Sequence, residues 1–465
     1  MNKTHEIDMT RGKLFPKLLA FLLPLMLSSL LQIAFNAADL IVVGRFGRPN
    51  SLAAVGSNGP MINLIVTLLM GLATGGGVLC ARHYGARDAE RLRATVSTAL
   101  IVGGVGGVLI GAIGVFLAEP MLRLIGSPED VAPLAAVYLR ILFAGLPAAA
   151  LYNFAGAALR AMGNTRQPLI FLAVAGVVNV LLNLFFVIVL GIDVAGVALA
   201  TVLSQCLSCY LTVRCLLRAE ELSLRELRFS LPVFRRIAAI GLPAGVQGAL
   251  FSISNFLIQA AVNSFGAAVV AGNAACISLE NFLYRPQDAA AQTATTAISQ
   301  NVGAQEYKRS CRAMGSCLLL VTGISAVMGG LTLLFRRPLL GLYTTDEAAL
   351  AAAFVRMGIV VLAFTFNGTM AVMNGTLRGL GRSLTPAIVT FLGVCALRIV
   401  WLYTAFAAHR TLPWLYVSYP ITWVLTTGVL LICYFAVRKK PFHVLRESGS
   451  RTEAQGEENR TALTE

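Results

Sequence analysis

Twelve long apolar segments constrain this chain more than any other feature. About 20 consecutive apolar residues cross a bilayer as a helix, and a helix satisfies its own backbone hydrogen bonds where no water is available. Segments of this length lie at 14–44, 53–80, 94–118, 132–158, 168–190, 194–217, 236–264, 267–301, 312–335, 349–376, 386–408 and 414–437. The sequence therefore predicts an all-α integral membrane protein with twelve transmembrane helices.

The chain is also strongly basic, with a formal net charge of +15. Such an excess can indicate nucleic-acid binding, but here the basic residues gather in every second connection between apolar segments. Only Arg140, Arg285, Arg356 and Arg398 lie well inside the segments. Because basic connections stay in the cytoplasm, we expect both termini there, contacts with anionic lipid headgroups, and no nucleic acid.

The first apolar segment is far longer than a signal-peptide core and lacks a cleavage site. We therefore expect it to remain as the first span of a multi-pass protein of the cytoplasmic (inner) membrane, and we expect a monomer. The nine cysteines are scattered through apolar stretches, which indicates buried or lipid-facing thiols and not a disulfide framework.

The second part of the chain repeats the first. Several short matches recur at an offset of 218 or 219 residues: Pro24 with Pro243, Asn36 with Asn255, Gly85-Ala86 with Gly303-Ala304, and Leu159-Arg160 with Leu377-Arg378. The spans thus form two homologous six-helix bundles. Since each bundle crosses the membrane an even number of times, the two have the same orientation and are related by a pseudo-two-fold axis along the membrane normal.

The repeat predicts five regions. They are a cytoplasmic tail at 1–13, an N-lobe at 14–218, a cytoplasmic linker at 219–231, a C-lobe at 232–439, and a disordered cytoplasmic tail at 440–465. Two homologous lobes that face each other are typical of transporters, whose substrate sites lie between the repeats.

One acidic residue stands out inside the first span. Ser28, Gln32, Asn36 and Asp39 are spaced to share one face of a helix that is otherwise apolar. A carboxylate is costly in lipid, so we expect Asp39 to face a protein interior or a wet cavity where the two lobes meet. Pro24 precedes this stripe and predicts a hinge, because it removes a backbone hydrogen bond.

Further polar residues lie inside the C-lobe spans. Glu280, Tyr284 and Asp288 share one face of the eighth span, where Arg285 is spaced to neutralise Asp288. Glu280 either lines the substrate pathway or has a structural role. Arg398 is costly in lipid and predicts an interior position, where it could hold an internal acid such as Glu280.

Amide side chains gather on four of the spans. They either join helices or contact substrate: Asn179 and Asn183 on the fifth span, Asn255, Gln259 and Asn263 on the seventh, Asn367 and Asn374 on the tenth, and Gln32 and Asn36 on the first. Their concentration favours a polar pathway through the lobes. We expect Asn36, Asn179 and Asn183 to take part in ion coupling with Asp39, and Gln32, Asn255, Gln259 and Asn367 to line the substrate pathway together with Glu280, Tyr284 and Arg398.

Signs of an enzyme are absent from the sequence. It has no P-loop, no GxSxG and no HExxH motif, and its four histidines lie at span ends or in tails. We therefore expect no cofactor and no metal, and transport driven by a proton or sodium gradient.

Several stretches together resemble the multidrug and toxic compound extrusion (MATE) family. They are FNAADLIVVG at 35–44, AAVG at 53–56, LRAMGNTRQP at 159–168, LRGLGRSLTP at 377–386, VN at 178–179 and GVALAT at 196–201. The resemblance covers the chain from about residue 14 to residue 440.

The resemblance implies antiport of amphipathic, often cationic small molecules against H+ or Na+ by a rocker-switch between two lobes. Asp39 is similar to the family's first-helix aspartate, Pro24 to the proline at which that helix bends, and Asn179 to its partner on the fifth span. Asn183 stands where some members carry a second aspartate, which favours protons over sodium. The alternatives are a flippase for lipid-linked saccharides or lipids, and a membrane-embedded enzyme or receptor.

Overall fold

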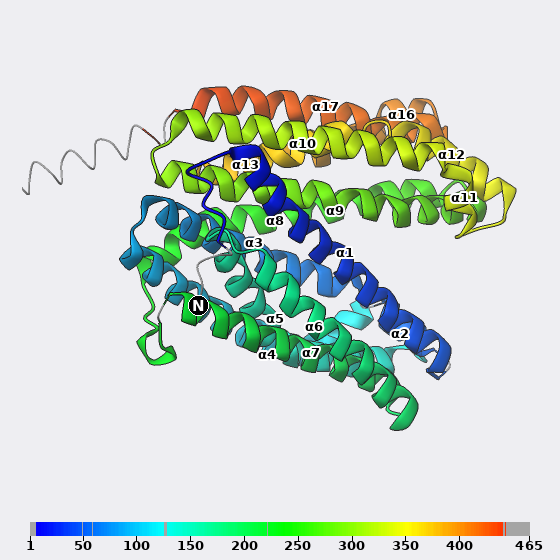
Figure 1. Cartoon of the computed structure of the whole chain (residues 1–465). Coiled ribbons are helices and arrows are strands. Elements are labelled where there is room, and N and C mark those ends of the chain that lie inside the picture. The colour runs from blue at the N-terminus through cyan, green and yellow to red at the C-terminus, as the bar shows by residue number, and fades with distance from the viewer. Residues whose placement is uncertain are drawn as a thin grey trace, which may run out of the picture.

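The computed structural model describes residues 6–48, 50–57, 59–124, 128–220, 222–439 and 442. Every regular element in these residues is a helix (Figure 1). Eleven helices are long and apolar enough to cross a membrane, and α12 (Glu347–Val360) and α13 (Phe364–Gly379), bent by 50° at a short break, make a twelfth span together. The predicted all-helical membrane fold and its twelve spans are confirmed.

The helices of the N-lobe follow the predicted spans closely. They are α1 (Leu14–Phe46), α2 (Ser51–Ser57), α3 (Gly59–Ala86), α4 (Ala89–Leu124), α5 (Ala132–Ala161), α6 (Arg166–Leu184), its continuation η2 (Phe185–Val189) and α7 (Asp193–Ala219). The predicted second span differs, because a short helix, α2, precedes α3 and α3 continues to Ala86.

The C-lobe repeats this order after a connection that contains one short helix, η3 (Leu224–Glu226). Besides α12 and α13, its helices are α8 (Leu231–Asn263), α9 (Ala267–Gly303), α10 (Tyr307–Leu334), α11 (Arg336–Gly341), α14 (Leu384–Thr390), η4 (Phe391–Ala396), α15 (Leu397–Tyr403), α16 (Ala405–Ala408) and α17 (Leu412–Val437). The predicted tail at 440–465 falls, apart from Phe442, outside the described residues.

The lobes touch at the end with the basic connections and diverge toward the end with α2 and α11 (Figure 1). The contact is close because glycines on α3 meet α8 and α9. A Cβ added to Gly71 would lie 2.3 Å from the Gly245 backbone, and one added to Gly85 would meet the Gln300 carbonyl. Only glycine permits helices to approach this closely. We call this contact region the seam.

Helix α1 belongs to both lobes. Its first turns, with Leu18, Phe21, Leu22 and Leu25, are buried in the same hydrophobic cluster as α9, α10 and α17 of the C-lobe. Its later turns pack against α6 of the N-lobe. Pro24 lies where the helix passes from one lobe to the other, so a change of bend there would move the lobes relative to each other.

The segment before α1 fastens both lobes at the seam. Met9 is fully buried, its amide donates to Gln300 Oε1 at 3.0 Å, and its carbonyl accepts from Arg309 Nε at 2.7 Å. On the other side, the Ile7 amide donates to the Gly163 carbonyl of the N-lobe at 3.2 Å. The part of the predicted tail that the structure describes is therefore packed between the lobes.

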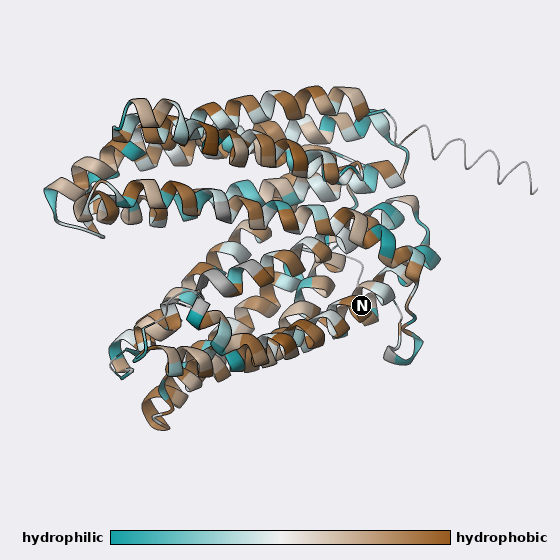
Figure 2. Cartoon of the chain, turned by 180° about the vertical axis from the view of Figure 1, so that it is seen from behind, coloured by the Kyte–Doolittle hydropathy of each residue, from teal (hydrophilic) through white to brown (hydrophobic). Residues whose placement is uncertain are grey.

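The outer surface matches a bilayer. Hydrophobic residues cover the outer helices and hydrophilic residues gather in the connections at both ends (Figure 2). Large apolar side chains such as Phe116, Leu181 and Ile432 are more than half exposed. A surface of this kind is stable only against lipid or another apolar partner.

Candidate functional site

Asp39 lies at the centre of a small polar group inside the N-lobe. Its side chain is 9% exposed. Asn183 Nδ2 donates to one carboxylate oxygen, and the Thr201 hydroxyl lies 3.5 Å from the other. Asn183 also donates to Asn179 Oδ1 at 3.3 Å. The sequence thus predicted correctly that Asp39 faces a protein interior, and the fold brings it together with Asn179 and Asn183.

All these partners are on α6 and α7. The expectation that Asp39 faces the meeting point of the two lobes is therefore wrong, because α1 turns this residue into its own lobe. No basic side chain forms an ion pair with Asp39 within the described ranges. A buried acid held only by neutral groups exchanges its proton more readily than one locked to a cation.

The Thr201 hydroxyl can serve both charge states of Asp39. It has a single hydrogen, and two acceptors lie within reach: Asp39 Oδ2 at 3.5 Å and the Val197 carbonyl at 3.0 Å. When the Thr201 hydroxyl donates to the Val197 carbonyl, its oxygen can accept a hydrogen bond from a protonated Asp39. When the hydroxyl instead donates to Asp39, it stabilises the carboxylate.

Asn36 and Gln32 do not join this group. Both side chains are exposed, and neither forms a hydrogen bond to another described residue. They share a helix with Asp39 but point elsewhere, so the ion-coupling role of Asn36 and the pathway role of Gln32 stay predictions. Pro24 lies inside an unbroken α1.

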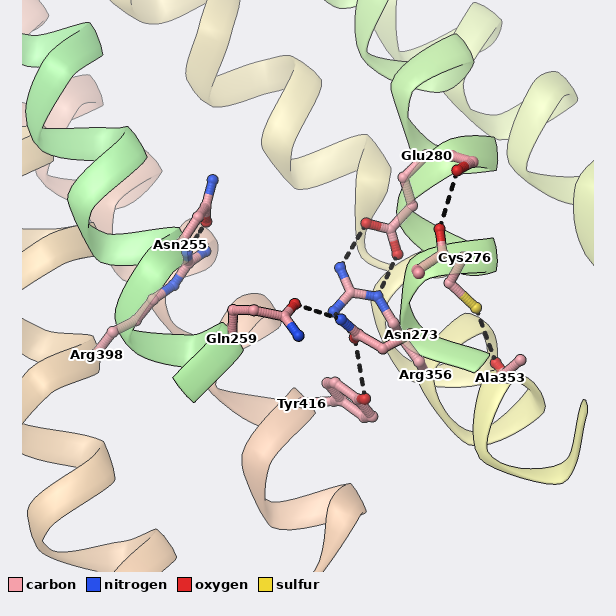
Figure 3. A network of polar contacts seen from close by, with 11 residues as sticks. Asn255, Gln259, Asn273, Cys276, Glu280, Ala353, Arg356, Arg398 and Tyr416 are labelled. Carbon is pink, nitrogen blue, oxygen red and sulfur yellow. Dashed lines mark hydrogen bonds and ion pairs between the residues drawn. The ribbon is translucent and has the colours of Figure 1, made fainter. Parts of the chain in front are cut away.

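The C-lobe contains a second buried polar group, which Figure 3 shows. Arg356 of α12 makes two hydrogen bonds to Glu280 of α9, at 2.6 and 2.8 Å, and a third to Asn273 Oδ1 at 2.8 Å. Asn273 in turn donates to Gln259 at 2.8 Å and accepts from the Tyr416 hydroxyl at 3.2 Å. Both charges are almost completely buried, and they neutralise each other.

The proposed pairing of Arg398 with Glu280 is therefore wrong. Both carboxylate oxygens of Glu280 accept hydrogen bonds from Arg356. The only sign of this role in the sequence was that Arg356 lies inside an apolar segment. Arg398 of α15 instead donates to Asn255 Oδ1 at 3.3 Å and to Thr422 Oγ1 at 3.4 Å. Figure 3 shows Arg398 beside Asn255, apart from the Glu280–Arg356 pair.

The other predicted C-lobe residues have local partners. Asn367 donates to Gln287, which itself binds the Phe364 carbonyl at 2.9 Å, so this amide joins α13 to α9. Tyr284 packs against the Phe364 ring. Asp288 is exposed and forms no direct ion pair with any described residue, although the charges of Arg285 and Arg378 act on its carboxylate from a longer distance.

Three contributors to these groups carried too little signal in the sequence. Thr201, Asn273 and Gln287 are single polar residues on apolar helices, and such residues are common at helix contacts. Only their hydrogen bonds to Asp39, Arg356 and Asn367 distinguish them.

A family model for MatE matches the chain twice, over residues 24–185 and 243–404. The two matches begin at Pro24 and Pro243, the prolines that the internal repeat pairs. They cover most of both lobes, including Asp39, Glu280 and Arg398.

Curated relatives and solved structures agree with this match. The chain is 27% identical over 392 residues to a probable multidrug resistance protein of Bacillus subtilis, YoeA, covering 82% of this chain and 84% of that protein. It is 24% identical to an FAD transporter of Shewanella oneidensis, covering 75% and 80%. The fold matches a MOP superfamily transporter from Pyrococcus furiosus with a TM-score of 0.87, at 22% identity, over 95% of this chain and 99% of that one.

The duplicated helical lobes, the buried Asp39 group and the double family match lead to one identification. The proteins of this family are transporters and not enzymes. This chain belongs to the MATE family.

Proposed function

We propose that the chain is a secondary multidrug efflux antiporter that exports amphipathic small molecules in exchange for protons. The relatives that carry multidrug resistance names support efflux, and the observation that supports proton exchange is the Asp39 group. Among the described residues, this group holds one carboxylate, no cation, and a hydroxyl that fits both protonation states.

Protonation would act on the lobes through α1. A proton on Asp39 reverses its hydrogen bond with Thr201 and removes a negative charge that α6 and α7 stabilise. Asp39 is on the part of α1 that packs in the N-lobe, whereas the turns before Pro24 pack in the C-lobe. A shift of the later turns would therefore change the bend of α1 at Pro24, between the parts that pack in the two lobes. Such a change supports a rocker-switch.

The basic connections lie at the seam, so we place both termini and the seam on the cytoplasmic side of the cell membrane. The lobes then diverge toward the outside. In this arrangement Asp39 receives its proton from outside, and substrate and proton disfavour each other's binding reciprocally.

The test uses purified protein in liposomes, with rhodamine 6G as substrate and the proton and sodium gradients imposed separately. We expect the proton gradient to drive transport by wild type, and Asp39→Asn to lower that rate by at least about tenfold, because the exchanging group is lost. Asp193→Asn is the matched control. Asp193 is another buried acid of the N-lobe, but it bonds Ser51 of α2, so its variant should keep gradient-driven transport.

Undiminished proton-driven transport by Asp39→Asn would contradict the mechanism. If a sodium gradient alone drives transport by wild type, the chain is still an antiporter, but its coupling ion is sodium and not the proton.

A further inference from the structure

Arg398 is a buried cation that forms no ion pair with any described residue. Among the described residues, Arg356 and Arg398 are the arginines with buried side chains, at 3% and 1% exposure. Arg356 is neutralised by Glu280. Arg398 has only the neutral oxygens of Asn255 and Thr422, and its Nη2 has no hydrogen-bond partner. A guanidinium in this state is far from its best environment.

In the part of the chain that the structure describes, no carboxylate forms an ion pair with Arg398. The ionisable side chains that act on Arg398 most are two tyrosines and a cysteine, Tyr419, Tyr284 and Cys395, and Arg356, which has the same sign. Glu280 is bound by Arg356 through both oxygens. The C-lobe therefore keeps one net positive charge at this place.

Aromatic rings surround the guanidinium. Its central carbon lies 4.1 Å from the Tyr419 ring centre and 6.0 Å from those of Phe251 and Trp423. Ring faces stabilise a cation partly, which explains how Arg398 is tolerated. The same rings are also suitable contacts for an aromatic ligand.

Asn255 connects this place to the space between the lobes. The seam face of α8 contains Gly241, Gly245 and Gly248, which contact α3. Asn255 follows Gly248 by seven residues, so it lies on the same face two turns later. There its side chain is exposed, because the lobes have diverged, and its Nδ2 has no partner among the described residues.

We infer that Arg398 and Asn255 form a binding position for the anionic group of a soluble aromatic substrate. This rests on the proposed transport function and names the substrate class. A carboxylate or sulfonate facing α8 would accept from Asn255 Nδ2 and, after a small shift of that amide, from Arg398 Nη2. These would be charge-assisted hydrogen bonds in a site of low polarity.

The test is equilibrium binding to purified protein in a neutral detergent, followed by fluorescence anisotropy. The probes are 5-carboxyfluorescein and rhodamine 6G, which share a xanthene ring system but carry opposite charges. We expect wild type to bind the anionic dye, Arg398→Met to bind it at least about tenfold more weakly, and Arg398→Lys to retain most of the affinity, because a charged hydrogen bond is lost in the first and a cation kept in the second.

Asn255→Asp keeps the arginine and so serves where Arg398→Met fails to fold. The new carboxylate would pair with Arg398 and should also weaken the binding of carboxyfluorescein at least about tenfold. The binding of rhodamine 6G should not become weaker. Unchanged carboxyfluorescein affinity in Asn255→Asp would overturn the inference. So would displacement of the dye by short-chain phosphatidylglycerol at a lower concentration than by 1-naphthoate, an aromatic carboxylate that does not emit at the wavelength of the dye. That result would assign the position to a lipid headgroup.

This outcome is separate from that of the transport test. Binding needs no gradient, and Asp193→Asn, whose side chain bonds Ser51 far along the chain from Asn255 and Arg398, should bind carboxyfluorescein like wild type. A failed antiport mechanism with intact dye binding, or the reverse, identifies which proposal is wrong.

Discussion

The two lobes repeat one six-helix unit, yet each holds a buried charge of opposite sign that has no ion-pair partner among the described residues. In the N-lobe a buried carboxylate, Asp39, has amide and hydroxyl partners and no cation. In the C-lobe a buried guanidinium, Arg398, has amide and hydroxyl partners and no carboxylate. The same scaffold therefore supports both signs, and no described residue of its own lobe forms an ion pair with either charge.

The C-lobe also contains the contrasting case. Glu280 and Arg356 are as deeply buried as Arg398, but they neutralise each other and are held by Asn273, Gln259 and Tyr416. We propose a division of roles between these charges. The paired Glu280 and Arg356 fix the positions of α9 and α12, whereas the unpaired Asp39 and Arg398 stay available to a proton and a ligand.

The largest expected effect tests this division through stability. Arg356→Met leaves Glu280 buried and unpaired, and we expect it to destabilise the fold by about 3–5 kcal/mol. Arg398→Met removes an unpaired cation and should leave stability unchanged or raise it. Thermal unfolding in detergent measures both variants. Equal destabilisation would show that Arg398 has a structural role like that of Arg356.

The next effect concerns the N-lobe alone. Thr201→Val removes the hydroxyl that serves both forms of Asp39, and we expect proton-driven transport to fall by about tenfold, which corresponds to one hydrogen bond. Thr201→Ser keeps the hydroxyl and is the matched control. Initial rates in liposomes under a fixed pH gradient provide the measurement. If valine and serine variants transport equally well, the hydroxyl takes no part in coupling.

The smallest effect concerns the segment that fastens the two lobes together. Burial tends to raise the pKa of Asp8, but the hydroxyl and amide of Thr10, with the charges of Lys17 and Arg87, outweigh it and lower that pKa. Because the pKa is lower in the folded than in the unfolded state, Asp8 stabilises the segment fully above its unfolded pKa. That stabilisation is lost as the pH falls through the folded value.

Wild type should therefore lose slightly more thermal stability than Asp8→Asn does as the pH falls from about 5 to about 2, and the two should differ little above that range. Unfolding midpoints across that range, for the two proteins side by side, give the comparison. If the unfolding midpoints of the two proteins change with pH at the same rate, Asp8 does not help to hold the segment between the lobes.

Much of the fold could be predicted, because twelve apolar stretches, an internal repeat and the distribution of basic residues each follow from one strong physical constraint. Asp39 was predictable for the same reason, since a carboxylate inside a span needs an interior partner. Its partners Asn179 and Asn183 were visible as an i, i+4 pair. The wrong predictions concerned which buried charges pair with each other. The C-lobe spans contain three arginines, Arg285, Arg356 and Arg398, and only two acids. Spacing along one helix does not show which residue of another helix lies opposite.

The rotation of α1, and so the direction in which Asp39 faces, also could not be predicted from the sequence. The stripe that contains Asp39 suggested a surface between the lobes, but α1 crosses from one lobe to the other and presents different residues to each. The lobe that a residue faces depends on packing across the seam, where glycine contacts set the distance between helices.

Two hydrogen bonds at the seam offer a way to measure how often the lobes separate. Gln300 Nε2, on the C-lobe, donates to the Ala161 carbonyl of the N-lobe at 2.8 Å. The Ile7 amide donates to the Gly163 carbonyl of the N-lobe, while Met9, two residues later, is bonded to Gln300 and Arg309 of the C-lobe. Separation of the lobes at this end with Met9 held on the C-lobe has to break both of these bonds. The rate at which the Ile7 amide exchanges with deuterium then reports how often the protein opens there, with no substrate, dye or label present.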